Sequence, residues 1–423
     1  MYLKGSKWSL QRRKKRSHPV RVFFLAVLVA GMFYINQFVV PTVPPLFIPT
    51  PTPTRSPDSY LVEAQQLIGE GKITQAIAAY QEAAKVDPRN PSIYVTLARW
   101  QVFFRDYEGA AENIQNALLL NPNHALAKAV QGWILAKQDD YLAAEAALRE
   151  ALELDPNSAL AYAYRAELYI DMLNADKGDA NTQSRAIADS QEARRLDPDL
   201  LEVHRVRGLI LEVTGQFQEA IPEYKAAIQQ NENLADLHVA LGRTYRKAGE
   251  YALAVEELNQ AIALRPDDPE PYTEMASTYL TWGEFTKGAQ IAEQAVQRNP
   301  ADPFVQGLLG TMYFKLGSYG EAVYPLRLAV RGGQAFTLDA DGNQVAVEVQ
   351  GIPLSRDLLY AMPYYSRYGI ALAHVGQCGE ALQIAQQLLQ VYPGDPDVEY
   401  NVDLIIETCE NQEVNPSPEN PEG

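Results

Sequence analysis

The sequence predicts an all-α protein, a stack of antiparallel helix pairs preceded by one N-terminal transmembrane helix. Three observations lead to this prediction. A pattern that ends in proline recurs at a 34-residue spacing through most of the 423 residues. Within each copy, small and bulky side chains keep fixed positions at helical spacing. Near the N-terminus, a basic cluster is followed at once by an apolar run.

The first 40 residues have the composition of a membrane anchor. Residues 1–21 carry eight basic side chains and no acidic one, and residues 22–40 begin with VFFLAVLVAGMFYI. As a helix these 19 residues rise about 28 Å, enough to cross a bilayer. We therefore expect a single-pass protein of the cell membrane. Its anchor is not cleaved, its basic tail lies in the cytoplasm, and its body lies on the exported side. The alternative is a signal peptide cleaved near Val29-Ala30-Gly31, which gives the body the same location.

The segments that flank the body are predicted to lack regular structure. Residues 41–57 are rich in proline and threonine, which favours an extended linker, and residues 412–423 are polar and rich in proline. The net charge of −17, with +8 in the tail, leaves −25 for residues 22–423. Nucleic acid is therefore not an expected partner, because so acidic a body repels phosphate.

The repeats divide residues 58–395 into nine units. Two steps are longer than 34 residues, which places insertions near 172–182 and 333–357, and two units lack the proline. The residues at the shared position 32 are Pro88, Pro122, Pro156, Pro198, Glu232, Pro266, Pro300, Gln334 and Pro393.

Small residues recur at positions 8 and 20 of every unit, and bulky residues fall around positions 4, 11 and 24. Both sets follow helical spacing, so each unit reads as two amphipathic helices whose backbones approach closely at the small residues. One such pair cannot bury its own apolar face, and neighbouring pairs must stack. Position 8 is occupied by Ala64, Ala98, Gly132, Ala166, Gly208, Gly242, Ala276, Gly310 and Gly369.

This pattern resembles the tetratricopeptide repeat (TPR), a 34-residue helix-turn-helix unit. The resemblance covers about four fifths of the chain. It implies a right-handed superhelix whose concave groove binds peptide or protein segments, with positions 2, 5, 9, 12 and 13 of the first helix lining that groove. Some family members clamp chaperone tails with asparagines at position 9. Other residues stand there in units 2 to 6, so that role is not expected.

Carrying these positions onto the chain gives the candidate groove residues. Arg205, Arg243, Arg246 and Lys247 form a local basic patch for an acidic or carboxylate-ended segment. The alternative is that these cations pair with acidic neighbours such as Glu202 and Asp236. The candidate apolar residues of the groove are Trp133, Phe103 and Phe314, unless they serve superhelix packing instead.

The C-terminal third adds three features. Residues 333–355 alternate in polarity around Asp341-Gly342-Asn343, which predicts a β-hairpin. Such a hairpin either gates the groove or packs as a decoration. Residues 396–411 are expected to form a capping helix. Cys378 and Cys409 fall on one edge of the stack, which predicts a disulfide in an exported protein, with two buried thiols as the alternative.

The sequence therefore predicts a non-catalytic scaffold that holds protein or peptide segments. We expect no cofactor and no metal site, since the five histidines are scattered and no phosphate loop or paired cysteine spacing occurs. The alternative function is an accessory or sensor subunit of an envelope enzyme that binds a small ligand or glycan. A pocket with converging polar groups would favour that alternative, and a long open groove would favour the scaffold.

Overall fold

The computed structural model describes residues 18–39, 55–338 and 342–414. It divides the chain into two units, Met1–Arg55 and Ser56–Gly423, which are treated separately below. The expectations for the basic tail before residue 18, for linker residues 40–54 and for the final residues 415–423 lie outside the described residues.

In the N-terminal unit, helix α1 runs from Pro19 to Tyr34 and continues as the π-helix η1, Ile35–Val39. Pro19 suits the first helical turn, because that position has no intrahelical partner for an N–H group. The span Pro19–Phe38 is long and apolar enough to cross a membrane, and its side chains are not buried by protein. This length and apolar composition are consistent with an anchor. A signal sequence near the N-terminus has the same two properties.

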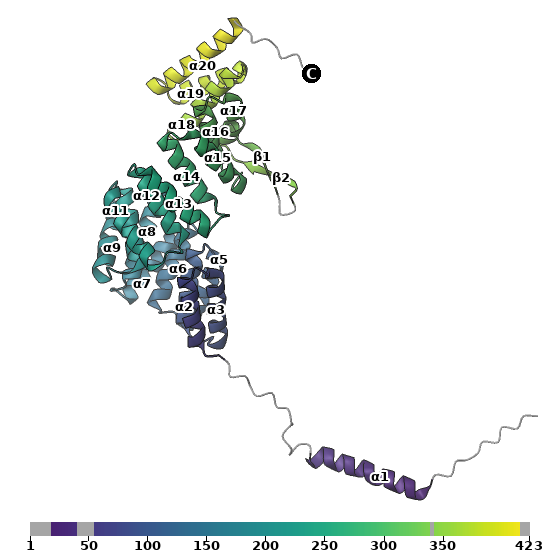
Figure 1. Ribbon diagram of the computed structural model, residues 1–423. Helices are drawn as coiled ribbons and strands as arrows, with labels where there is room; N and C mark the ends of the chain where they lie inside the picture. Colours follow the sequence, from purple (N-terminus) through teal and green to yellow (C-terminus); the bar gives the residue numbers. More distant parts are fainter. Residues whose placement is uncertain (1–17, 40–54, 339–341, 415–423) are drawn as a thin grey trace, which may run out of the picture. The chain divides into compact units, whose positions relative to one another are not determined.

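The second unit begins with nine helix pairs, as predicted (Figure 1). In each pair we call the first helix A and the second helix B. The pairs are α2 (Pro57–Gly69) and α3 (Ile73–Val86), α4 (Pro91–Phe103) and α5 (Tyr107–Leu120), α6 (Ala125–Lys137) and α7 (Tyr141–Leu154), α8 (Ala159–Asn174) and α9 (Thr182–Leu196), α10 (Leu201–Val213) and α11 (Phe217–Gln230), α12 (Ala235–Lys247) and α13 (Tyr251–Leu264), α14 (Pro269–Trp282) and α15 (Phe285–Arg298), α16 (Pro303–Lys315) and α17 (Tyr319–Arg331), and α18 (Met362–His374) and α19 (Cys378–Val391).

Close packing within a pair depends on the small residues at position 8. A Cβ atom added to Gly310 would lie 2.5 Å from Cγ of Leu326, which occupies position 24 of the same unit. The residues at position 20 are buried in the same way, for example Ala110 and Ala254. Large side chains at position 24 therefore fit only because the facing helix presents almost no side chain.

The turn between helices A and B needs a residue with positive φ at position 15. Six of the nine pairs have glycine there, for example Gly71 with φ 73°. Unit 2 instead has Arg105 with φ 61° and unit 3 has Asp139 with φ 63°, while in unit 4 the positive φ falls on Asp176, three residues further on, because helix α8 is longer. A non-glycine residue in this region costs free energy, and at Arg105 this cost coincides with ion pairs made by its side chain.

The two predicted insertions differ in form. The extra residues of unit 4 lengthen helix α8 and form the loop before α9. The second insertion contains the antiparallel strands β1 (Gly333–Leu338) and β2 (Gln344–Val349), with Gly333 opposite Val349, while residues 339–341 at the tip are not described. Ala335 and Val349 pack against Leu328 of α17, so the base of the hairpin is anchored on a B helix.

Helix α20 (Pro396–Val414) ends the stack. It buries one stripe, Val398, Val402, Ile405 and Cys409, against the last pair. Cys409 forms a disulfide with Cys378 at the start of α19, with a Cα–Cα distance of 5.6 Å.

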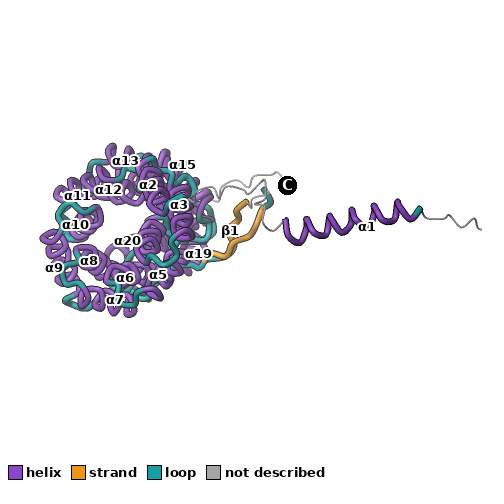
Figure 2. The backbone as a smooth tube through the Cα atoms, turned by 90° about the horizontal axis from the view of Figure 1, so that it is seen from below, coloured by secondary structure: helices purple, strands orange, loops and turns teal. Residues whose placement is uncertain are grey.

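The stacked pairs curve so that A helices line the inside. Each A helix from α4 to α16 contacts the next A helix as well as its own partner. Figure 2 shows α8, α10 and α12 on the inner side of a ring, with α9, α11 and α13 outside them. The groove predicted from the family resemblance corresponds to this inner surface.

Candidate functional site

The inner surface of units 2–7 contains a partly open cavity of about 320 Å³. Residues from six successive A helices, α4 to α14, converge on it, together with a few side chains from other elements. Its lining includes Phe103, Arg105, Trp133, Lys137, Glu167, Asp171, Arg205, Leu209, Asp236, Arg243 and Glu270. Aromatic rings and charges of both signs therefore meet around one space.

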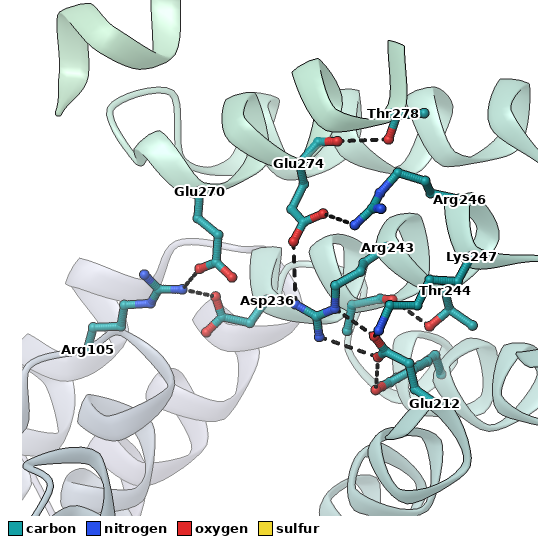
Figure 3. Close-up of polar contacts among 12 residues, drawn as sticks. Arg105, Glu212, Asp236, Arg243, Thr244, Arg246, Lys247, Glu270, Glu274 and Thr278 are labelled. Atoms are coloured by element: carbon teal, nitrogen blue, oxygen red, sulfur yellow. Dashed lines mark hydrogen bonds and ion pairs between the residues drawn. The ribbon is translucent and has the colours of Figure 1, made fainter. Parts of the chain in front are cut away.

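Glu212 on α10 is the centre of one ion-pair cluster (Figure 3). Its side chain is 2% exposed and accepts hydrogen bonds from Nε of Arg243 at 2.7 Å and Nζ of Lys247 at 2.9 Å. The hydroxyl of Tyr224 donates to the same carboxylate at 3.1 Å. Burial favours a higher pKa for Glu212, but the two cations outweigh burial and lower the pKa below its ordinary value.

Arg246, the remaining basic candidate of α12, pairs with Glu274 of α14 at 2.9 Å. Glu274 also lies 3.9 Å from Arg243. The ion pairs therefore run without a break from α10 through α12 to α14 (Figure 3).

Glu167 on α8 is the centre of a second cluster. It accepts hydrogen bonds from Arg205 of α10 at 2.8 Å and from Lys137 of α6 at 2.8 Å. Lys137 also contacts Asp171, one turn further along α8, at 2.8 Å. Burial works against the charged form of Glu167, yet the two cations keep its pKa well below the ordinary value. For Asp171 burial prevails and raises the pKa.

These contacts show that the basic patch expected from the sequence is balanced by acids on the same surface. The four basic candidates all pair with carboxylates of neighbouring A helices. Counting cations at the groove positions overlooked Glu167 and Glu212, which stand at positions 9 and 12 of the same set. The acids suggested as alternative partners, Glu202 and Asp236, pair instead with Arg99, Arg105 and Arg265.

The three apolar candidates lie in different surroundings. Trp133 is almost fully buried and stacks on Tyr164 with ring centroids 4.5 Å apart. Phe103 packs edge-on against Trp133 at 5.1 Å and remains partly exposed at the cavity. Phe314 belongs to another part of the stack, where it packs on Tyr319 of α17. The structure thus brings Trp133 and Phe103 together and separates Phe314 from them.

A contact across the curved stack joins unit 2 to units 6 and 7, which the sequence did not predict. Arg105, in the strained turn of unit 2, donates to Asp236 of α12 at 2.9 Å and to Glu270 of α14 (Figure 3). It also lies 3.6 Å from Asp268. Burial opposes the charge on Arg105, but these acids outweigh it and raise its pKa. We call this group, together with Arg265, the closure cluster.

Apolar and polar contacts accompany the closure cluster. Trp100, Phe103 and Phe104 of unit 2 pack against Leu201, Leu234 and Leu237 of units 5 and 6. Arg99 pairs with the buried Glu202 across the same gap. Asn233 donates a hydrogen bond from Nδ2 to the carbonyl oxygen of Gly69 at 3.3 Å. The first units therefore lie against units 5–7 and close one turn of the stack.

Asp236, Asp268 and Glu270 have oxygen atoms close enough together to hold a cation. Arg105 and Arg265 already occupy the space between these oxygens. Guanidinium groups satisfy clustered carboxylates with directed hydrogen bonds. We therefore interpret the cluster as an ion-pair network of the fold.

The inner surface of units 8 and 9 is arranged differently. Arg367 of α18 is partly buried, and among the described residues its side chain donates a hydrogen bond from Nη1 to Oγ1 of Thr311 on α16 at 3.4 Å. Burial lowers the pKa of Arg367. Phe304, at the start of α16, packs against Tyr360, which precedes α18. Both rings are about half exposed, and their centroids are 5.5 Å apart.

Family comparison agrees with this architecture. Three tetratricopeptide repeat models match residues 67–134 and 214–277, residues 127–158, and residues 273–335. The chain is a tetratricopeptide repeat protein, a class of helical arrays that bind other proteins or peptides.

Solved structures with the same kind of fold are similar at low sequence identity. PilW, a type IV pilus biogenesis factor, is 21% identical over 48% of this chain and 91% of its own, with a TM-score of 0.43. The Cut9–Hcn1 heterotetramer of APC/C matches at 17% identity over 69% of this chain and 53% of the other, with a TM-score of 0.49. PilF of Pseudomonas aeruginosa is 20% identical over 48% and 90%, with a TM-score of 0.40. No curated protein matches the chain in sequence.

Proposed function

We propose that this protein is a non-catalytic scaffold, tethered to the membrane by its N-terminal helix, that holds segments of partner proteins on the exported side. The observation that carries the proposal is the inner surface, where the eight consecutive A helices from α4 to α18 pack side by side along one curved face. Such a surface suits extended or helical segments that contact several repeats in turn.

The apolar span supports the tether. Pro19–Phe38 has the length of a membrane helix and is not covered by protein. The basic residues that precede it favour retention of the N-terminus in the cytoplasm. The disulfide between Cys378 and Cys409 is of the kind that persists in an oxidising, exported compartment.

The residues expected to contact partners are a further part of this proposal. Arg205, Arg243, Arg246 and Lys247 contribute by fixing neighbouring glutamates, so they shape the inner wall. Phe103 and Phe314, which are only partly buried, offer apolar contacts, and Trp133 supports Phe103 from below.

Site-directed photo-cross-linking in intact cells tests the scaffold. A photoreactive phenylalanine analogue at Phe304 lies on the inner face of unit 8, and the same analogue at Leu142 lies on an exposed part of B helix α7. We expect a discrete cross-linked protein at Phe304 and none at Leu142. Equal labelling at both positions, or none at either, contradicts a scaffold that uses its inner face.

The tether is tested separately. Alkaline extraction should leave the full-length protein in the membrane fraction, and protease added to the exported side should degrade the repeats but spare residues 1–21. Release of the protein by alkali, or protection of the repeats from that protease, contradicts the proposed topology.

The cavity of units 2–7 supports a second candidate function, the binding of a small ligand or glycan by an accessory or sensor subunit. Its volume of about 320 Å³ and its converging Lys137, Glu167 and Arg205 suit a small polar molecule. In the structure Lys137 and Arg205 already pair with Glu167, so these charges do not need a ligand, which favours the scaffold. A small-molecule library that raises the unfolding temperature through this cavity would favour the alternative.

A further inference from the structure

Arg367 differs from the inner-face cations of units 2–6 in its partners. Arg205 and Arg243 each meet a buried glutamate, whereas Arg367 has a neutral hydroxyl at 3.4 Å. Within residues 55–338 and 342–411, the structure gives Arg367 no ion pair with a carboxylate. A partly buried guanidinium without a counter-charge is unfavourable, because burial removes water that would otherwise stabilise the charge.

The surroundings of Arg367 hold it in place at the inner face. Thr311 is buried on α16, and its hydroxyl accepts a 3.4 Å hydrogen bond from one end of the guanidinium. Tyr364, one turn before Arg367, packs against Gly307, where an added Cβ atom would lie 2.7 Å from the tyrosine ring. Because the helix already positions the cation, an incoming anion would not have to order a flexible side chain.

An apolar surface lies at the start of α16, the helix whose Thr311 contacts Arg367. Phe304 is 45% exposed and contacts Tyr360, which is 51% exposed in the segment before α18. Phe304 and Thr311 lie two helical turns apart on the same helix, so Phe304 and the residue that Arg367 contacts are about 10 Å apart along α16. This spacing suits two side chains of one bound segment.

We propose that the inner face of units 8 and 9 binds a segment of a partner protein through one acidic side chain, with Arg367 as its counter-ion and the Phe304–Tyr360 pair as the adjoining apolar contact. This inference rests on the proposed scaffold function and assigns the chemistry of its ligand. The carboxylate supplies the ion pair that Arg367 lacks in the free protein.

The charge of the whole body favours a single acidic residue over an acidic run. Residues 22–423 carry −25, so the long-range field repels a polyanion. Recognition of a carboxylate therefore depends on the short-range pair with Arg367, and the apolar neighbour supplies the rest of the affinity.

A peptide array tests the proposal with the full-length protein in lipid nanodiscs. The probes are 12-residue Gly-Ser peptides that carry one Leu and one Glu at every relative spacing, each paired with a counterpart in which Gln replaces Glu. The Glu peptides and their Gln counterparts end in a carboxamide, and an additional set of the Gln peptides ends in a free carboxylate. The variants are Arg367→Gln, Arg367→Lys and, as a control of equal charge change on B helix α17, Arg327→Gln.

We expect the best Glu peptide to bind the unmodified protein about tenfold more tightly than its Gln counterpart, the usual strength of a hydrogen bond to a charged group. Arg367→Gln should abolish this preference, Arg367→Lys should keep part of it, and Arg327→Gln should leave it unchanged. Thermal unfolding of each variant in the same nanodiscs confirms that the fold is intact.

Three results overturn the proposal. The preference for Glu persists in Arg367→Gln, or no Glu peptide binds better than its Gln counterpart, or only peptides with a free terminal carboxylate bind. The scaffold function is judged independently by cross-linking at Phe304, so a partner captured there without any Glu preference rejects this inference alone.

Discussion

Units 2–7 and units 8–9 use the same helix pair to make two unlike inner surfaces. In the former, cations meet buried glutamates such as Glu212, and Arg105 joins unit 2 to units 6 and 7. In the latter, Arg367 has only a hydroxyl partner among the described residues and aromatic rings are exposed. A repeated backbone therefore does not give a uniform binding surface. What a stretch can bind depends on whether its own charges are already paired.

The two regions are also held together by different forces. Ion pairs and the closure cluster stabilise units 2–7, whereas a disulfide joins the last helix pair to the capping helix α20. In a linear stack, stability is close to a sum of local terms, so a perturbation should remain near its site. Hydrogen exchange, read separately for each region, is the appropriate measurement.

Arg243→Met should give the largest effect. It removes the principal partner of Glu212 and leaves that buried carboxylate with Lys247 and Tyr224. Breaking a buried pair in this way costs about 3–5 kcal/mol. Amides of α10 and α12 should lose protection in hydrogen exchange while those of α18 keep theirs. Equal loss in both regions would mean that the stack unfolds as one unit.

Replacing Cys378 and Cys409 by serine should have the next largest effect, in the opposite region. The bond closes a loop with a sequence separation of 31, for which loss of the cross-link costs about 3.7 kcal/mol. Helix α20 should exchange rapidly, and units 2–7 should remain unchanged. An unaltered α20 would show that its buried stripe suffices without the disulfide.

Acid should weaken units 4–6 before units 8 and 9. The pKa values of Glu167 and Glu212 are lowered in the folded state, so their contribution is complete above the unfolded value, about 4.3, and is lost as pH falls through the folded values. Asp171 opposes this trend, because burial raises its pKa. Exchange at pH 3–7 should show protection of α8 and α10 falling below about pH 4.5. Protection that rises on acidification would contradict this sign.

Arg105→Gly should produce a smaller change in stability and a measurable change in closure. Arg105 is 39% exposed, so its ion pairs contribute about 1 kcal/mol or less, and glycine relieves a positive φ of similar cost. Overall stability should hardly change. Amides around Leu234 and Leu237 should exchange faster as unit 2 separates from them. The matched control is Asp139→Gly, which alters the same turn position in unit 3.

Arg367→Met should have the smallest effect on stability, none or a slight gain. A partly buried cation without a carboxylate partner in the described structure loses little when it is replaced by an apolar side chain of similar length. Chemical denaturation compares it directly with Arg243→Met. A loss comparable to that of Arg243→Met would show that Arg367 has a structural role.

The sequence was sufficient to predict features that depend on local periodicity. The nine helix pairs follow from the small residues at positions 8 and 20, and the hairpin follows from alternation around Gly342. Adjacent units repeat one geometry, so the ion pair between Arg205 of unit 5 and Glu167 of unit 4 could have been predicted from the same numbering of positions. The missing step was to count acids at the groove positions alongside the cations.

The closure of the stack could not be predicted in this way. Arg105 and Asp236 are 131 residues apart, and their contact depends on small rotations added over four successive units. A modest error per unit moves unit 2 away from unit 6 altogether. One local signal was present in the sequence, because arginine stands at position 15 where most units have glycine.

The most direct test of the account is a cross-link between Gly71 and Asn233, each replaced by cysteine. A Cβ atom on Gly71 would lie 3.3 Å from Cβ of Asn233, close to the separation of about 3.5–4.5 Å in disulfides. The native cysteines are paired with each other and do not interfere. If the turn is closed, mild oxidation joins residues 71 and 233 in a single chain, and more slowly when Arg105→Gly is added. If both new cysteines remain open to alkylation, units 1 and 2 do not contact units 5–7, and the distinction between the two inner surfaces is wrong.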